Sequence, residues 1–212
     1  LPKHIPMDKA NLASEFKVLG KVNVLLALGM SVLASTSLFS VFTYIAPILQ
    51  HEAAASTPFV TAMLVLFGVG LTLGNVWGGK AADRSIDRTL ILSLAGLIAV
   101  LLVFPLVLDW PLPTALAILV WGAASFALVP PLQMRVMEAA KDAPNLASAV
   151  NIGAFNLGNA IGAALGGAVI NAGLGYPAIS LAGAAMAALG LVLVLLLAWR
   201  GRGVVAGRQV AL

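Results

Sequence analysis

Cysteine is absent from this sequence and charge is scarce, and both absences narrow what the protein can be. Without cysteine there are no disulfide bonds and no thiolate metal sites. Asp, Glu, Lys and Arg make up only 9% of the 212 residues, whereas soluble domains contain about a quarter. Hydrophobic residues make up 61%. This composition is typical of a membrane protein.

A secretory signal peptide is also missing. Residues 1–21 contain four lysines and two acids, with no short apolar core that ends in small residues. The sequence begins with Leu1 and not with Met, so we expect it to be part of a longer chain.

Six long apolar runs dominate the chain. A transmembrane helix needs about 20 mostly apolar residues. The runs are joined by short connections, which predicts an all-α membrane domain over 22–199, between a cytoplasmic loop segment at 1–21 and a cytoplasmic tail at 200–212. The predicted spans lie at about 22–49, 58–77, 90–108, 113–134, 146–170 and 177–198.

The twelve Lys and Arg residues occur only in every second connection between these spans and at the two ends of the chain. They precede the first span, follow the sixth, and occupy the loops after the second and fourth spans, while the other three loops contain none. Basic residues gather on the cytoplasmic side of membranes. We therefore predict six spans with both ends in the cytoplasm. The net charge of +4 orients the protein and does not indicate nucleic-acid binding, because no basic stripe with interleaved aromatics is present.

Two of the runs carry glycine at every fourth position, which places the glycines on one helix face. Because such faces allow close helix contact, we expect these glycines to serve helix packing. The striped helix is second in each triplet of spans, and the triplets cross the membrane in opposite directions, as in inverted three-span repeats. The alternative is ordinary helix packing without a repeat. The glycines are Gly70, Gly74 and Gly78 in the second span and Gly158, Gly162 and Gly166 in the fifth.

The segment GKAADRSIDR at 79–88 resembles the loop signature of the major facilitator superfamily, which links the second and third spans of each six-span half. Two positions depart from the signature: Ile86 replaces its usual glycine and Asp87 a usual basic residue, as is typical of the copy in the carboxyl-terminal half. Four longer segments are similar to the drug:proton antiporter branch, and most of all to arabinose-efflux-type permeases. They are SVFTYIAPIL, LFGVGLTLGNVWGGKAADR, WGAASFALVPPLQMRV and NLASAVNIGAFNLGNAIGAALGGAVI.

This resemblance implies that the loop forms a conformational latch from Gly79, Asp83, Arg84 and Arg88. In the family, the aspartate interacts with the amino terminus of a neighbouring helix, and a carboxylate suits the positive end of a helix dipole. The alternative is a solvated charge cluster that only holds the loop inside the cell.

Polar side chains within the spans are candidates for a substrate cavity, because polar groups avoid lipid. In the first span they fall within an arc of about 120° at 100° per residue. The alternative is that these hydroxyls bond to their own helix or to a neighbour. The candidates are Thr36, Ser37, Ser40, Thr43 and Tyr44 in the first span, Trp121, Ser125 and Gln133 in the fourth, and Asn151, Asn156 and Asn159 in the fifth.

The fourth span also contains Pro130 and Pro131, which remove backbone donors and should kink or break the helix. Its Trp121 could stack on a sugar ring or aromatic drug, or could pack in the core. The three asparagines of the fifth span lie within an arc of about 140° that overlaps its glycine stripe. Helix packing and substrate contact are therefore both open for them.

No Asp, Glu, Lys, Arg or His lies in the middle of any span, although a proton-coupled carrier needs a titratable group in the membrane. The resemblance implies that the coupling acid lies in an amino-terminal half of six further spans. We expect no cofactor, no metal site and no enzyme activity, because both histidines lie outside the spans and no carboxylate pair or phosphate loop is present.

The sequence thus predicts the carboxyl-terminal half of a bacterial inner-membrane carrier that exports small sugars or drug-like compounds by alternating access, driven by protons. Its expected partners are the lipid bilayer, a small-molecule substrate, and an amino-terminal six-span half or a second copy of the chain. Two alternatives remain: a six-span module that dimerises or assists membrane assembly without transporting, and an uncoupled facilitator.

Overall fold

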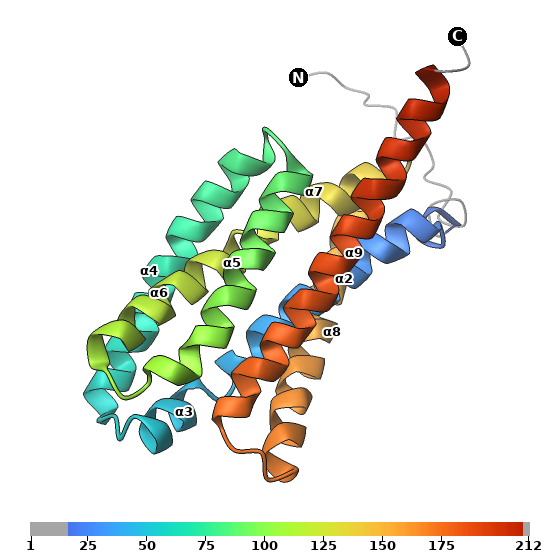
Figure 1. Ribbon diagram of the computed structural model, residues 1–212. Helices are drawn as coiled ribbons and strands as arrows, with labels where there is room; N and C mark the ends of the chain where they lie inside the picture. Colours follow the sequence, from blue (N-terminus) through green and yellow to red (C-terminus); the bar gives the residue numbers. More distant parts are fainter. Residues whose placement is uncertain (1–16, 210–212) are drawn as a thin grey trace, which may run out of the picture.

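The computed structural model describes residues 17–209, with side chains as far as Trp199. Part of the predicted cytoplasmic loop segment, 1–16, and residues 210–212 of the predicted tail lie outside the described residues. Eight helices build the described part (Figure 1): α2 (Val22–Phe42), α3 (Ile45–Glu52), α4 (Thr57–Ala82), α5 (Ile86–Val107), α6 (Pro111–Phe126), α7 (Val129–Ala139), α8 (Pro144–Asn171) and α9 (Pro177–Gln209).

Six segments are long and apolar enough to cross a membrane, which confirms the predicted all-α fold with six spans. Their mean hydropathy lies between 1.3 and 2.9. They are Val22–Phe42, Thr57–Ala82, Ile86–Val107, Pro111–Ala139, Pro144–Asn171 and Pro177–Trp199. Several begin with proline in their first turn, where the missing N–H has no intrahelical partner to lose.

The first and fourth spans are both broken. The fourth divides into α6 and α7 at Ala127–Leu128, just before the prolines that predict a break. The first divides into α2 and α3 at Thr43–Tyr44, which corrects the expectation of one continuous helix over 22–49. The cause is Pro47, the third residue of α3, which cannot donate to the preceding turn and crowds it.

The two glycine stripes face different partners in equivalent ways. The stripe of α4 packs on α6, and the stripe of α8 packs on α2, so the second helix of each triplet contacts the first span of the other. A Cβ at Gly74 would overlap the Ala123 carbonyl oxygen, and one at Gly162 would lie 2.6 Å from the Thr36 carbonyl oxygen. Backbone contact this close needs glycine. This reciprocal packing matches an inverted repeat.

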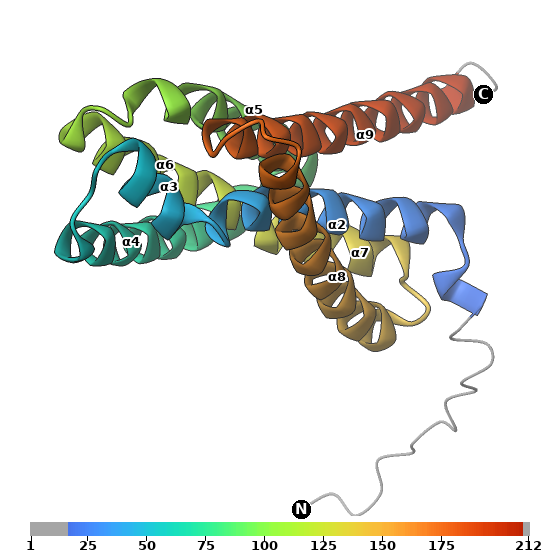
Figure 2. The ribbon, with the colours of Figure 1, turned by 90° about the horizontal axis from the view of Figure 1, so that it is seen from below.

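The third spans of the two triplets, α5 and α9, pack against each other, and α9 also packs on α2 while α5 packs on α6. Figure 2, seen from the end that carries α3, shows α3, α4 and α6 on one side and α8 and α9 on the other. The last glycine of each stripe, Gly78 or Gly166, lies against the break in the first span of the other triplet, at Ala127 or Tyr44. The break in the first span of each triplet therefore lies against the end of the other triplet's glycine stripe.

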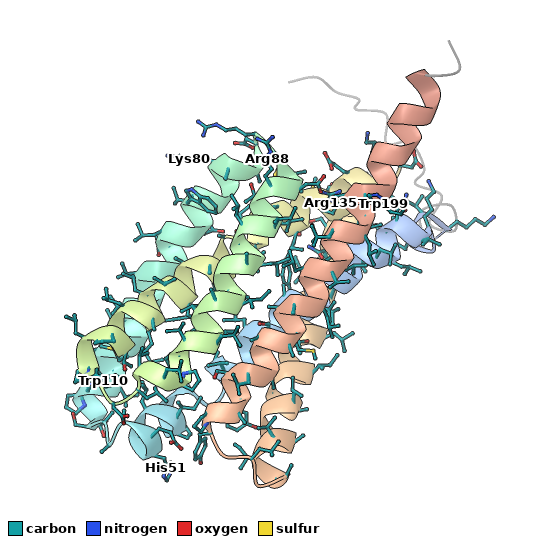
Figure 3. The ribbon with its side chains drawn as sticks, in the orientation of Figure 1. His51, Lys80, Arg88, Trp110, Arg135 and Trp199 are labelled. Atoms are coloured by element: carbon teal, nitrogen blue, oxygen red, sulfur yellow. The ribbon has the colours of Figure 1, made fainter. Side chains whose placement is uncertain are left out.

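The charged residues lie near the ends of the spans and divide between the two ends of the molecule. Lys80 and Arg88 lie at one end of the helices, and His51 and Trp110 at the opposite end (Figure 3). Every loop with Lys or Arg that the structure describes belongs to the first end, as expected for a chain whose basic residues alternate from loop to loop.

Candidate functional site

A cavity of about 250 Å³ opens between α2, α6, α7 and α8, beside the break in the fourth span. Most of its wall is apolar, with three phenylalanine rings and several aliphatic side chains. Three polar residues interrupt this wall, and each comes from a different helix. The lining residues are Ala34, Ser35, Leu38, Phe39, Ser125, Phe126, Leu128, Val129, Leu132, Phe155 and Asn159.

Ser35 and Asn159 form a polar corner of the cavity. The Ser35 hydroxyl donates to the Phe155 carbonyl oxygen at 2.9 Å and also contacts the Asn159 side-chain oxygen. These contacts use the oxygen of the Asn159 amide, so its NH₂ group can still donate to a molecule in the cavity. Ser35 was absent from the sequence candidates, although it adjoins Thr36 and Ser37 in the same run of hydroxyls.

Ser125 is the second polar feature. Its side chain is buried on the face of α6 that lines the cavity. Its hydroxyl has no hydrogen-bond partner among the described residues. A buried hydroxyl without a partner costs about 1–3 kcal/mol. A ligand or water in the cavity would recover this energy, so Ser125 can serve as a hydrogen-bonding contact.

The other hydroxyls of α2 do not line this cavity. The Thr36 hydroxyl donates to the Gly158 carbonyl oxygen on α8 at 3.2 Å. The Ser40 hydroxyl donates to the Ser37 carbonyl oxygen, one turn earlier, at 2.9 Å. Gly183 of α9 packs against Ser37 and Ser40. These three side chains are buried at helix contacts, which is the alternative to substrate contact that the sequence left open.

The arc of polar residues predicted in the first span ends at the break. Thr43 is exposed and bonds back to the Phe39 carbonyl oxygen at 2.7 Å. Tyr44 donates to the Ala163 carbonyl oxygen on α8 at 2.9 Å. Tyr44 therefore contacts α8, as Thr36 does, and neither Thr43 nor Tyr44 is among the residues that line the cavity.

Trp121 is part of the protein core and does not line the cavity. Its ring lies 4.6 Å from the Phe67 ring, between centroids, and 6.4 and 6.5 Å from those of Phe42 and Phe104. The residue is only 2% exposed.

Gln133, Asn151 and Ser148 join α7 to α8. The Gln133 amide donates to the Ser148 hydroxyl at 2.7 Å, and the Asn151 amide donates to the Gln133 side-chain oxygen at 2.7 Å. Asn151 is fully buried. Of the three asparagines in the fifth span, Asn159 lines the cavity, Asn151 lies in this network, and Asn156 is exposed.

The charged end of the molecule carries an ion pair that the sequence analysis did not predict. Arg135 on α7 pairs with Asp87, in the first turn of α5. Arg135 is only 22% exposed and Asp87 45%. A hint was present in the sequence, because an arginine follows an apolar span and needs a partner when half-buried.

The residues proposed as a latch surround this pair. Asp83 and Arg84 are exposed and line the same polar hollow as Asp87 and Arg135. Asp83 follows the carboxyl end of α4, whereas Asp87 has the helix amino terminus that suits a carboxylate. Arg88 is exposed, and Gly79 lies near Pro130 of α7.

A second ion pair fastens α2 to α8 at the same end. The Lys21 ammonium donates to Asp142 at 2.7 Å, immediately before the two helices begin. This hydrogen bond, together with the positive charge, lowers the pKa of Asp142 below its ordinary value of 3.8. Both side chains are mostly exposed, so the pair contributes little to stability.

Over the part of the chain that the structure describes, no group of three or more His, Cys, Asp or Glu side chains could hold a metal ion.

Comparison with known proteins gives a consistent result. The model of the Major Facilitator Superfamily matches residues 27–207. The chain is 51% identical over 194 residues to the inner membrane transport protein YdhP of Escherichia coli K12, an alignment that covers 92% of this chain and 50% of the relative.

Two further relatives carry more specific names. The chain is 30% identical to the chloramphenicol resistance protein of Streptomyces lividans, over 76% of this chain and 43% of that protein. It is 29% identical to a protein of Pasteurella multocida described as "probable sugar efflux transporter", over 93% and 49%. The chain therefore spans about half the length of the curated relatives it matches.

Proposed function

This chain belongs to the major facilitator superfamily, and from that premise we propose that it is the carboxyl-terminal half of a proton-coupled efflux carrier. The membership makes it a multi-pass membrane protein of a transporter family and not an enzyme. We assign it to the inner membrane, as the name of its Escherichia coli relative suggests. Its partner would be an amino-terminal six-span half, joined covalently in the full protein, or a second copy of this chain.

The observation that carries the proposal is the unpartnered hydroxyl of Ser125 in an otherwise apolar cavity. Binding sites for small molecules are mostly apolar, with few polar groups that fix orientation. Here Ser125 and the Asn159 amide supply those groups, and the phenylalanine rings supply apolar area. This lining suits neutral or amphipathic compounds, in keeping with the sugar and chloramphenicol named for two relatives.

Alternating access would proceed by rocking this half against the other around the cavity. The end with Lys80, Arg88 and Arg135 would face the cytoplasm, because basic loops stay inside. At that end the Asp87–Arg135 pair, with Asp83 and Arg84 beside it, would stabilise one of the two conformations. We thus propose Asp87 as a member of the latch, in addition to the residues that the signature predicts.

Proton coupling would depend on residues outside this chain's cavity. The residues that line the cavity include no acid, base or histidine within the described part of the chain. The coupling acid would therefore come from the amino-terminal half. An uncoupled facilitator has the same cavity, and only the response to a pH gradient separates the two functions.

The test is transport by the native protein in proteoliposomes, with chloramphenicol and a panel of pentoses and hexoses as probes. A coupled exporter accumulates a probe against its gradient only when a pH gradient is imposed. Asn159→Ala should lower kcat/KM about tenfold, the loss expected for about one to two hydrogen bonds. Asn156→Ala, an exposed asparagine of the same helix, is the matched control.

Movement of a probe down its gradient alone, whatever the pH, would replace the antiporter with a facilitator. A protein that moves none of the probes and has an intact mass equal to this chain would favour a six-span module that does not transport.

A further inference from the structure

A second hollow lies on the outside of the helix bundle, on a different face of α6 from the cavity. It is a groove of about 320 Å³ between α4 and α5, with α6 as its floor, and it shares no lining residue with the cavity. Its wall is almost wholly apolar. The lining residues are Leu73, Gly74, Trp77, Leu92, Ser93, Val120, Ala123, Ala124 and Ala127.

The groove follows from how the three helices pack. Gly74 brings α4 into backbone contact with α6, and Gly96 lets α5 approach Ala124 of α6, with 3.9 Å to the position of a Cβ. The floor contains three alanines, whose short side chains do not fill the space between the walls. Leu73 and Leu92 stand on the walls and are 58% and 61% exposed. This apolar surface is therefore exposed on the outside of the described helices.

One end of the groove is basic. Lys80 follows Trp77 by three residues on α4, and Arg88 precedes Leu92 by four on α5, so each lies on the helix face that borders the groove. Both are exposed. Figure 3 shows the two side chains on the neighbouring ends of α4 and α5. Arg84, in the turn that joins these helices, adds a third basic side chain.

Three carboxylates are also present at this end. Asp87 is paired with Arg135, which neutralises its charge. Asp83 is exposed in the turn, and Glu138 is exposed on α7 beside it. Three basic side chains thus face two carboxylates that no basic group holds in an ion pair within the described residues, so the mouth of the groove keeps a net positive charge.

A polar group lies at a defined depth inside the groove. The Ser93 side chain is buried, 3% exposed, and its hydroxyl has no hydrogen-bond partner within residues 17–199. Ser93 is five residues beyond Arg88, which is about 7.5 Å along the helix. The polar layer on each side of a bilayer is about 5–7 Å thick. The hydroxyl is therefore placed to donate to an ester carbonyl below a headgroup.

We propose that this groove binds an anionic phospholipid. The phosphate would contact Lys80 and Arg88, the Trp77 ring would lie at the level of the headgroup, an ester carbonyl would accept from Ser93, and one acyl chain would fill the groove over the alanines of α6. Membrane surfaces of anionic lipid attract basic residues next to a span, and tryptophan prefers this interface. The groove combines these features with a slot for the chain.

The test uses the native protein, purified and titrated with phosphatidylglycerol or phosphatidylcholine in detergent, with bound lipid counted by native mass spectrometry. Lys80→Gln with Arg88→Gln should weaken phosphatidylglycerol binding about 10- to 30-fold, since each basic residue contributes about fivefold. Lys17→Gln with Lys141→Gln removes the same charge from exposed positions at the same end, away from the groove, and should not change binding.

Two single variants test the interior of the groove without changing charge. Ser93→Ala should weaken phosphatidylglycerol binding severalfold, and Ala124→Leu, which fills the floor, should weaken it further. Equal affinity for phosphatidylcholine, an equal loss in the Lys17/Lys141 control, or full binding by Ala124→Leu would overturn the proposal. If Ser93→Ala or Ala124→Leu has lost its cooperative melting transition, that variant does not fold. The variant with Lys80→Gln and Arg88→Gln, both surface substitutions, then tests the proposal.

Discussion

Two helix contacts that the repeat relates to each other, α4 on α6 and α8 on α2, share one packing device and differ in chemistry. Both use three glycines spaced by four, and in both the last glycine meets a broken first span. The α4–α6 contact is made by backbone and apolar groups, including the Phe67 and Trp121 rings. The α8–α2 contact adds Thr36, Tyr44, Ser35 and Asn159 as hydrogen-bonding residues.

This difference separates what the two triplets share from what only one of them carries. Glycine and proline fix the backbone of both triplets, so their positions are shared. The polar residues are not shared, and they gather on the side that borders the cavity. The turns differ in the same way: the turn after α4 is charged, and the turn after α8 is closed by Gly173 and Gly175 in the left-handed region, with φ of +74° and +79°.

The largest effect should come from the shared glycines. Gly74→Ala and Gly162→Ala should each cost about 3 kcal/mol or prevent folding, because the added Cβ overlaps backbone that cannot move independently. Thermal melting of the purified protein measures this loss. Gly68→Ala and Gly153→Ala on the same two helices are matched controls, since a Cβ there meets nothing within 4 Å. Equal stability in both sets would show that close packing is not what the stripes supply.

The charged turn should have an intermediate effect. Asp87→Asn should slow transport several-fold and also lower the melting temperature, because it leaves Arg135, whose side chain is only 22% exposed, without its partner. Asp83→Asn should also impair transport, but less, since Asp83 is exposed. Transport rates and the melting temperature of each variant give the comparison. Normal transport by both variants would leave the turn as an orienting charge cluster only.

The smallest effect concerns the Lys21–Asp142 pair, which occurs at the start of the α8–α2 contact. Because the pKa of Asp142 is lowered in the folded protein, the pair stabilises it above the unfolded pKa, and this contribution disappears as pH falls through the lowered value. Lys21→Gln should therefore melt slightly below the wild type near neutral pH. The two melting temperatures should converge once the pH has fallen below the lowered pKa of Asp142. A gap that widens on acidification would contradict this assignment.

The sequence predicted much of the backbone structure but not the contacts of the side chains. Six spans, the glycine stripes and the break at Pro130 follow from composition, period and proline chemistry, which are local. Pro47 was overlooked because the apolar run continues across it, so the break at Thr43–Tyr44 was not predicted. Ser35 and the Asp87–Arg135 pair were missed for a different reason. Which hydroxyl meets a cavity, and which carboxylate meets an arginine, depends on neighbours 48 or more residues away.

The most direct measurement is ligand protection of a thiol placed in the cavity. This chain has no cysteine, so Ser125→Cys and Asn159→Cys introduce single reactive groups into it. In the native protein, a transported compound should slow the reaction of both thiols with a maleimide, and should leave unchanged the reaction at Thr72→Cys, an exposed position on α4. If transport proceeds while neither cavity thiol is protected, the substrate does not pass through this cavity and the central claim is wrong.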